Sequence, residues 1–234
     1  MEPIRVDIWS DVACPWCWVG KRHLEEALTD LPFTVDITWR SFELDPSTPK
    51  SVPEGTDLVQ RLADKYGTSR AGAQAMIDRM DSVGTDNGLD FRFDKVKPGN
   101  TFDAHRLLHF ASTKGKQDAL KERLFLAYMH EGKLVSDHET LVQLAVEVGL
   151  DADQAQAVLS SNDFHAEVRA EQAQAMELGI RGVPFFVVQG RYGLSGAQPA
   201  ELIRQAIEQA HQEASPLQNV GADADACGPD GCAI

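Results

Sequence analysis

The chain has 234 residues, of which 43% are hydrophobic and 25% charged, and its formal net charge is −14. This composition excludes a mostly disordered chain. The acidic excess disfavours nucleic acid as a partner, because phosphate binding needs a cationic surface, and it also disfavours adsorption to anionic lipid. At this length we expect one domain with a large insertion or two closely packed lobes.

No segment approaches the run of about 20 apolar residues that a membrane-spanning helix needs. Residues 1–7 lack the cationic region and the following apolar region of a secretory signal. We therefore expect a cytoplasmic protein with no membrane partner.

The first fifty residues alternate between strand and helix patterns. β-Branched and aromatic side chains over 4–9 predict a strand, and alternating apolar residues over 33–39 predict a second one. Between them, a turn over 10–14 leads into a helical pattern that begins at Pro15 and stops before Pro32.

The middle of the chain, roughly 54–179, has almost no strand pattern. Apolar periodicity predicts helices over residues 57–66, 69–83, 102–113, 117–130, 138–148, 152–160 and 164–178. Asn100 and Asp137 are predicted N-caps, because short polar side chains accept orphan backbone N–H groups. Gly149 and Gly179 are predicted to end helices.

Strand patterns return near the C-terminus. Residues 183–188 and 191–194 predict a hairpin, and residues 199–211 predict a helix. Residues 214–234 lack periodicity and are expected to form a tail.

The four cysteines occur as two local pairs, Cys14 with Cys17 and Cys227 with Cys232. Disulfide frameworks belong to small secreted domains with weak cores, so redox catalysis or metal binding explains these pairs better. Cys14 opens a predicted helix, whose N–H groups and dipole should lower the pKa of its thiol and favour the reactive thiolate. Cys17 lies one turn further, close enough to form a disulfide with Cys14 and release a bound substrate. A half zinc site is the alternative.

Val183-Pro184 opens the predicted hairpin. Proline at the start of a buried strand indicates either an edge strand or a cis peptide bond, which usually serves a site. A cis bond here would leave the backbone groups of Val183 free to dock an extended peptide as an extra strand.

These features together resemble the DsbA family of thioredoxin-fold oxidoreductases over nearly the whole chain, to about residue 213. Three segments carry a narrower resemblance to the FrnE subfamily: Ser10-Asp11-Val12-Ala13-Cys14-Pro15-Trp16-Cys17, Asn100-Thr101-Phe102-Asp103-Ala104-His105-Arg106-Leu107, and Gly179-Ile180-Arg181-Gly182-Val183-Pro184-Phe185-Phe186. Some FrnE proteins also carry a C-terminal pair with the spacing of Cys227 and Cys232.

The resemblance implies an α/β thioredoxin fold with a large α-helical insertion. Residues 1–53 and 180–213 would form the thioredoxin-like domain, 54–179 the helical insertion and 214–234 a tail with the second cysteine pair. The implied activity is that of a thiol–disulfide oxidoreductase or disulfide isomerase acting on protein substrates. A thiol such as glutathione or thioredoxin would donate electrons, and no cofactor is implied.

The resemblance also assigns roles to residues. Cys14 matches the nucleophile, Cys17 the resolving thiol and Pro184 the cis-proline. The family's buried acid, which moves protons at the resolving cysteine, falls on the strand before the motif, where this chain offers Asp7.

Residues at the mouth of the predicted site are expected to touch substrate. These are Pro15, Trp16 and Val183. Periplasmic relatives often have a histidine at the position of Trp16, and its absence implies a less oxidising enzyme.

His105 and His109 are four residues apart, which is a spacing that metal ligands on a helix have. No accompanying carboxylate motif supports a metal site, so we interpret them as packed or capping histidines.

The C-terminal pair leaves three interpretations open. Gly228-Pro229-Asp230-Gly231 is typical of a turn and would bring Cys227 and Cys232 together. The pair could be a structural disulfide, half of a metal site, or a second redox pair that exchanges with Cys14 and Cys17.

Two other functions compete with the oxidoreductase. One is a glutathione-dependent enzyme of the kappa transferase or 2-hydroxychromene-2-carboxylate isomerase type, whose members usually have serine, or no cysteine pair, at the positions of Cys14 and Cys17. The other is a non-catalytic adaptor held by zinc. Metal analysis with thiol titration separates the adaptor from both enzymes.

Overall fold

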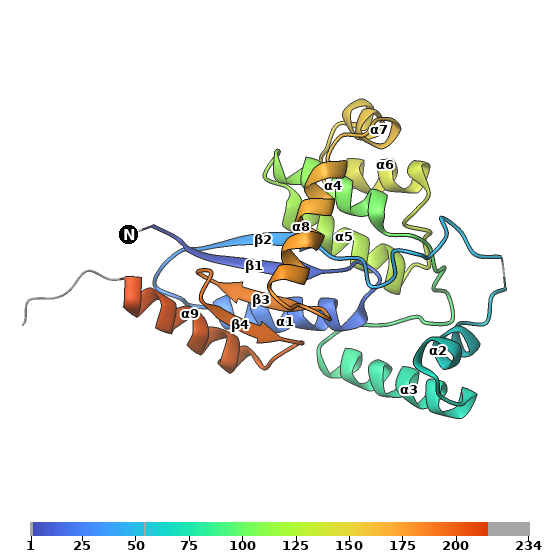
Figure 1. Cartoon of the computed structure of the whole chain (residues 1–234), viewed down its shortest axis with the longest axis horizontal. Helices are drawn as coiled ribbons and strands as arrows, with labels where there is room; N and C mark the ends of the chain where they lie inside the picture. The colour runs from blue at the N-terminus through green and yellow to red at the C-terminus, as the bar shows by residue number, and fades with distance from the viewer. Residues whose placement is uncertain (1, 54, 215–234) are drawn as a thin grey trace, which may run out of the picture.

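The computed structural model describes residues 2–53 and 55–214, and in these ranges one four-stranded sheet lies between layers of helices (Figure 1). The sheet has the order β2-β1-β3-β4. Its strands are β1 (Ile4–Ser10), β2 (Val35–Ser41), β3 (Phe185–Val188) and β4 (Tyr192–Ser195). Strand β1 pairs parallel with β2 and antiparallel with β3, so the sheet is mixed.

Alternation along β1 gives the sheet two distinct faces. Val6 and Ile8 belong to a core cluster with α1 (Pro15–Leu28) and α9 (Ala200–Ala214). Trp9 packs on the opposite face with Ala175 of α8 (His165–Glu177). The face to which a β1 residue points therefore decides whether it lies on the side of α1 or of α8.

Helices α2 to α8 all lie between β2 and β3 in the chain. In order after α1, they are α2 (Leu58–Tyr66), α3 (Arg70–Asp86), α4 (Phe102–Ser112), α5 (Gln117–Met129), α6 (His138–Glu147), α7 (Ala152–Ser160) and α8. Figure 1 shows α2 and α3 apart from α4 to α7, at the end of the molecule away from the N-terminus. A second core cluster joins α3 to α7 with the first turn of α1, which places the cysteine motif where the two cores meet.

The predicted helices and strands are present, with shifted ends. Strand β3 begins at Phe185 rather than residue 183, because Pro184 has no N–H to donate and pairing with β1 starts at Phe185. Asp137 caps α6 as predicted, accepting from Thr140 N at 2.8 Å. Asn100 accepts from Phe102 N at 2.9 Å, but the N-cap of α4 is Thr101.

Two further predictions concern glycines and membrane spans. Gly149 and Gly179 follow the ends of α6 and α8 with φ of 84° and 72°, a left-handed conformation that glycine adopts without strain. No helix in the described ranges is long and apolar enough to cross a membrane.

Candidate active site

Cys14 and Cys17 lie where the loop after β1 enters α1. Cys14 is the N-cap of α1 and Pro15 is the first helical residue, a position where a missing N–H does no harm. The Cys17 N–H donates to the Cys14 carbonyl at 3.0 Å. Both cysteines are free thiols, 4% and 0% exposed respectively, so the pair is reduced.

The loop before β3 closes over Cys14. The Val183-Pro184 peptide bond is cis, as predicted from the sequence. Cys14 Sγ lies 3.5 Å from the Val183 carbonyl oxygen, to which the thiol can donate. Cys14 and Val183, which are 169 positions apart in the chain, are thus in contact through the Cys14 sulfur.

The charge of the reduced pair contradicts the prediction of a more acidic Cys14. The hydrogen bond with Cys17, followed by burial, raises the pKa of Cys14 well above its ordinary value. Burial also opposes ionisation of Cys17, but the hydrogen bond from Cys14 and the charge of Lys121 outweigh it and lower the pKa of Cys17. The hydrogen bond between the two thiols and their burial therefore oppose the lower pKa that the start of the helix would give Cys14.

Sequence analysis missed the buried groups around this pair. Lys121 of α5 is 0% exposed, and its Nζ lies 3.4 Å from the Ser10 carbonyl oxygen. Asp11, in the loop before Cys14, is 2% exposed and lies 3.5 Å from His105 Nε2. The only sequence signal for Lys121 was a lysine beside Leu120 on an apolar helix face.

Asp7 does not lie on the side of the cysteines. It shares the α8 face of the sheet with Trp9, whereas α1 packs on the other face. Its carboxylate accepts from Arg40 at 2.6 and 2.8 Å and pairs with Arg5 at 3.0 Å. The prediction that Asp7 moves protons at Cys17 is not supported by this geometry, because alternation along β1 turns the side chain away.

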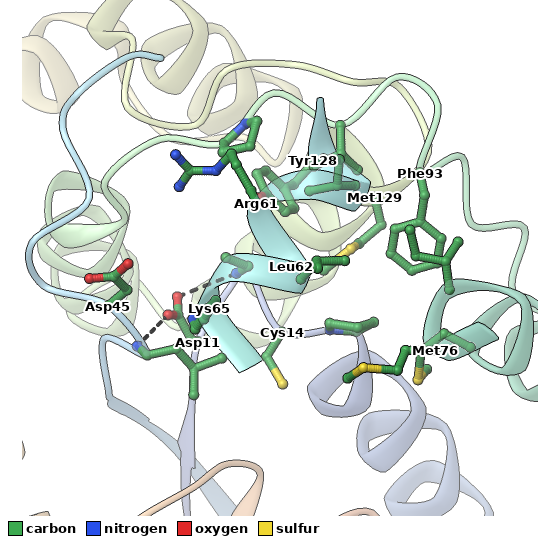
Figure 2. Close-up of a pocket in the computed structure, with 18 of the residues that line it drawn as sticks. Asp11, Cys14, Asp45, Arg61, Leu62, Lys65, Met76, Phe93, Tyr128 and Met129 are labelled. Atoms are coloured by element: carbon green, nitrogen blue, oxygen red, sulfur yellow. Dashed lines mark hydrogen bonds between the residues drawn. The ribbon is translucent and has the colours of Figure 1, made fainter. Parts of the chain in front are cut away.

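A cavity of about 840 Å³ opens beside Cys14. Figure 2 shows Leu62 of α2, Met76 of α3 and Phe93 among the side chains gathered around it. Pro15 and Trp16 also line the cavity, and Trp16 is 38% exposed, as expected of a residue at the mouth of the site. The other three tryptophans are buried: Trp9, Trp18 and Trp39.

Cys227 and Cys232 lie outside the described residues, so the structure says nothing of the second pair. Within 2–53 and 55–214, no group of three or more His, Cys, Asp or Glu side chains could hold a metal ion. His105 and His109 face two different carboxylates, Asp11 and Glu171, at 3.5 and 3.1 Å.

The chain matches the DSBA-like thioredoxin domain family over residues 5–208 and therefore belongs to it. Its fold is the α/β thioredoxin fold with a helical insertion. A probable DsbA oxidoreductase from Streptomyces coelicolor is 45% identical, with a TM-score of 0.83 and 99% of each chain covered. The uncharacterised protein YwbO of Bacillus subtilis is 29% identical over 206 residues, covering 87% of this chain and 96% of YwbO.

The fold is shared with enzymes of other activities. A 2-hydroxychromene-2-carboxylate isomerase has a TM-score of 0.67 at 16% identity, with 89% of this chain and 97% of the isomerase covered. At that identity the likeness concerns the fold alone, so the reaction has to be argued from the site.

Proposed function

We propose that this protein is a thiol–disulfide oxidoreductase with disulfide isomerase activity, acting on protein disulfides through Cys14 and Cys17. The observation that carries the proposal is the reduced pair itself. Of its two sulfurs, that of Cys14 lines the cavity and lies against the Val183 carbonyl, while Cys17 is fully buried behind it. A substrate disulfide can therefore reach Cys14 first.

The proposed cycle begins when Cys14 loses its proton. The Cys14 thiolate attacks one sulfur of the substrate disulfide, which forms a mixed disulfide and expels the other substrate sulfur. Cys17 then loses its proton, attacks Cys14 and releases the second substrate sulfur, and the two released substrate sulfurs take up two protons. Isomerisation follows when the first expelled thiolate attacks another substrate disulfide before Cys17 acts, and the thiolate expelled there attacks the mixed disulfide and releases Cys14.

Protein substrates fit the surroundings of Cys14. Three methionines line the cavity, Met76, Met80 and Met129, and flexible thioether side chains adapt to apolar groups of different shapes. Val183 would dock the extended segment that carries the disulfide, with Pro184, Pro15 and Trp16 beside it. Glutathione or thioredoxin would return electrons to the enzyme.

Several finer assignments are part of the same proposal. We place the chain in the FrnE-like subfamily and in the cytoplasm. Residues 1–53 with 180–213 would be the thioredoxin-like domain and 54–179 the insertion domain. Cys227 and Cys232 would exchange with the main pair, which a tether makes efficient by raising the local thiol concentration.

Insulin reduction and refolding of scrambled ribonuclease test the function. Wild type should be active in both assays, Cys14→Ser should lose activity about 100-fold or more, and Cys17→Ser should accumulate mixed disulfides at Cys14. The double variant Cys227→Ser, Cys232→Ser should keep attack by Cys14 but lose turnover in the isomerase assay. Full activity of Cys14→Ser would refute the proposal and favour the alternative function of a glutathione-dependent isomerase.

A further inference from the structure

His23 lies on α1 between two oxygen atoms that can only accept hydrogen bonds. Its ring nitrogen Nδ1 is 2.8 Å from the backbone carbonyl oxygen of Gln198, and Nε2 is 2.8 Å from Oδ1 of Asn87. The side-chain amide of Asn87 donates to the Val83 carbonyl at 2.8 Å, which fixes its nitrogen there and turns its oxygen toward His23. Both ring nitrogens of His23 therefore face acceptors.

Only a protonated ring satisfies both contacts. A neutral imidazole carries one N–H and one lone pair, whereas the imidazolium carries two N–H groups. When the ring of His23 loses its proton, one nitrogen lone pair faces an oxygen lone pair, and that contact is lost. If the Asn87 amide turned over to donate to the ring, its oxygen would instead face the Val83 carbonyl. One hydrogen bond is lost in either case.

The charged residues around His23 do not offer it an ion pair. Four other histidines pair with carboxylates in the described part of the chain, but His23 does not. Arg22, the neighbouring cation on α1, pairs with carboxylates of α1 and α5, and residues 196–199 around Gln198 carry no charge. The acidic residues closest in sequence to these groups on α1, α3 and α9 are all exposed: Glu25, Glu26, Asp86 and Glu201. The proton of His23 is therefore held by two neutral acceptors.

The three groups in contact belong to three parts of the candidate active site. His23 lies on α1, the helix of the cysteine motif, and Asn87 is the C-cap of α3. Gln198 lies in the loop after β4, where the Gly196 N–H donates to the Pro184 carbonyl at 2.8 Å. One side chain thus joins α1, α3 and the loop that is bound to the cis-proline.

Helix α3 forms one wall of the cavity beside Cys14. Met76 and Met80 are among the α3 residues that line it. Four of the 17 residues of α3 are buried, against eight of the 11 residues of α4, so α3 packs less tightly on the rest of the molecule. Elements with few buried contacts are released at a lower free energy, and polar contacts at their ends then help to hold them. The contacts of His23 are of this kind.

We propose that the protonated ring of His23 holds α3 against α1 and the cis-proline loop, so that a polypeptide binds in the cavity more tightly at acidic than at alkaline pH. His23 is a positioning residue, because it does not line the cavity itself. As pH rises through the titration of the ring, one contact is lost and the end of α3 is released. The inference rests on the proposed function for the identity of the ligand as a polypeptide.

Nuclear magnetic resonance of the full-length protein tests the contacts without substrate. At about pH 5.5 both N–H protons of the His23 ring should be observable, and amide shifts of α3 and of residues 196–199 should titrate together with the ring. Asn87→Asp places a carboxylate against Nε2 and should move this shared titration upward by about one pH unit. His23→Gln should abolish it. His165→Gln, an exposed change on α8, is the control and should leave it unchanged.

Peptide binding tests the consequence for the site. Full-length Cys14→Ser cannot form a mixed disulfide, so fluorescence anisotropy then measures binding alone. The probe is a short labelled peptide with apolar side chains around a methylated cysteine and without histidine. Its affinity should fall about fivefold from about pH 5.5 to about pH 8. Adding His23→Gln should remove this pH dependence, and adding Asn87→Asp should move the fall to higher pH.

A shared titration that is absent from wild type, or that persists in His23→Gln, would overturn the inference. An affinity that does not depend on pH, or no binding of the peptide at all, would equally refute it. If His23→Gln does not fold, Asn87→Asp decides, because a contact without a proton would not shift upward in pH. Since the resonance measurement uses no substrate, a wild type inactive on insulin would refute the proposed function and leave the result on His23 unaffected.

Discussion

Two clusters of ionisable side chains lie close to the sheet and differ in how their charges are balanced. The paired cluster, beside α8, consists of Asp7, Arg40, His109 and Glu171. The redox cluster, at the start of α1, consists of Cys14, Cys17, Asp11, His105 and Lys121.

Each carboxylate of the paired cluster lies within 3.1 Å of Arg40 or His109. Lys121 of the redox cluster instead faces a thiol pair whose charge changes with oxidation state.

The difference lies in pairing rather than in burial. Complete pairing lets a buried cluster persist unchanged, whereas burial lowers the pKa of Lys121 to about 8. Burial by itself does not distinguish the two clusters, since Glu171 and Lys121 are both buried. Glu171→Gln and Asp7→Asn test whether a change in the paired cluster affects the redox cluster.

The largest expected effect is on folding stability, from Glu171→Gln. Burial opposes ionisation of Glu171, but His109, Arg40 and the Ser41 N–H outweigh it and lower its pKa to about 2. The substitution should reduce the free energy of unfolding at neutral pH by about 3 kcal/mol, measured by urea denaturation.

The same carboxylate gives a pH dependence with a defined sign. Because the pKa is lower in the folded protein than its ordinary value of 4.5, the stabilisation is complete above that value and is lost as pH falls toward about 2. Wild-type stability should fall in this window, and that of Glu171→Gln should fall less.

Glu167→Gln, an exposed change on the same helix, should alter neither stability nor pH dependence. A shifted thiolate titration in Glu171→Gln would show that the two clusters are not separate.

A smaller loss of stability is expected from Asp7→Asn. The amide keeps one acceptor but removes the charge that holds Arg5 and Arg40, so we expect a loss of about 2 kcal/mol in urea denaturation. The thiolate titration and the release of mixed disulfides should not change. Asp36→Asn, exposed on β2, is the control for removing a charge from the sheet. Slower release in Asp7→Asn alone would restore the proton-transfer role predicted from the sequence.

The smallest effect on stability is expected from Gly20→Ala, which acts on the redox side. An added Cβ would lie 2.9 Å from Pro184 Cγ and 3.3 Å from Phe186 Cζ. Overpacking outweighs the better helix propensity of alanine, leaving a net loss of about 1 kcal/mol.

Displacement of Pro184 from Cys14 should also reduce insulin reduction severalfold. Gly182→Ala, where an added Cβ meets nothing within 4 Å, should keep both stability and activity. Equal activity in the two variants would mean that the contact between α1 and Pro184 does not position the site.

Local patterns in the sequence were sufficient for the elements and for part of the site. Strand and helix periodicity located β1, α1 and the insertion helices, because each element has to bury one face. The CPWC motif located Cys14 and Cys17, and Pro184, taken together with that motif and the family resemblance, indicated the cis bond, since these signals are confined to a few adjacent residues.

Tertiary structure alone decided the electrostatics of the pair. Lys121 lies more than 100 residues from Cys17 in the chain and enters the site only because α5 packs against α1 and β2. The orientation of Asp7 depended on the register of β1 within the sheet, which strand periodicity does not fix. A helix N-terminus is visible in a sequence, but the burial of Cys14 and its hydrogen bond with Cys17, which raise its pKa, are properties of the fold.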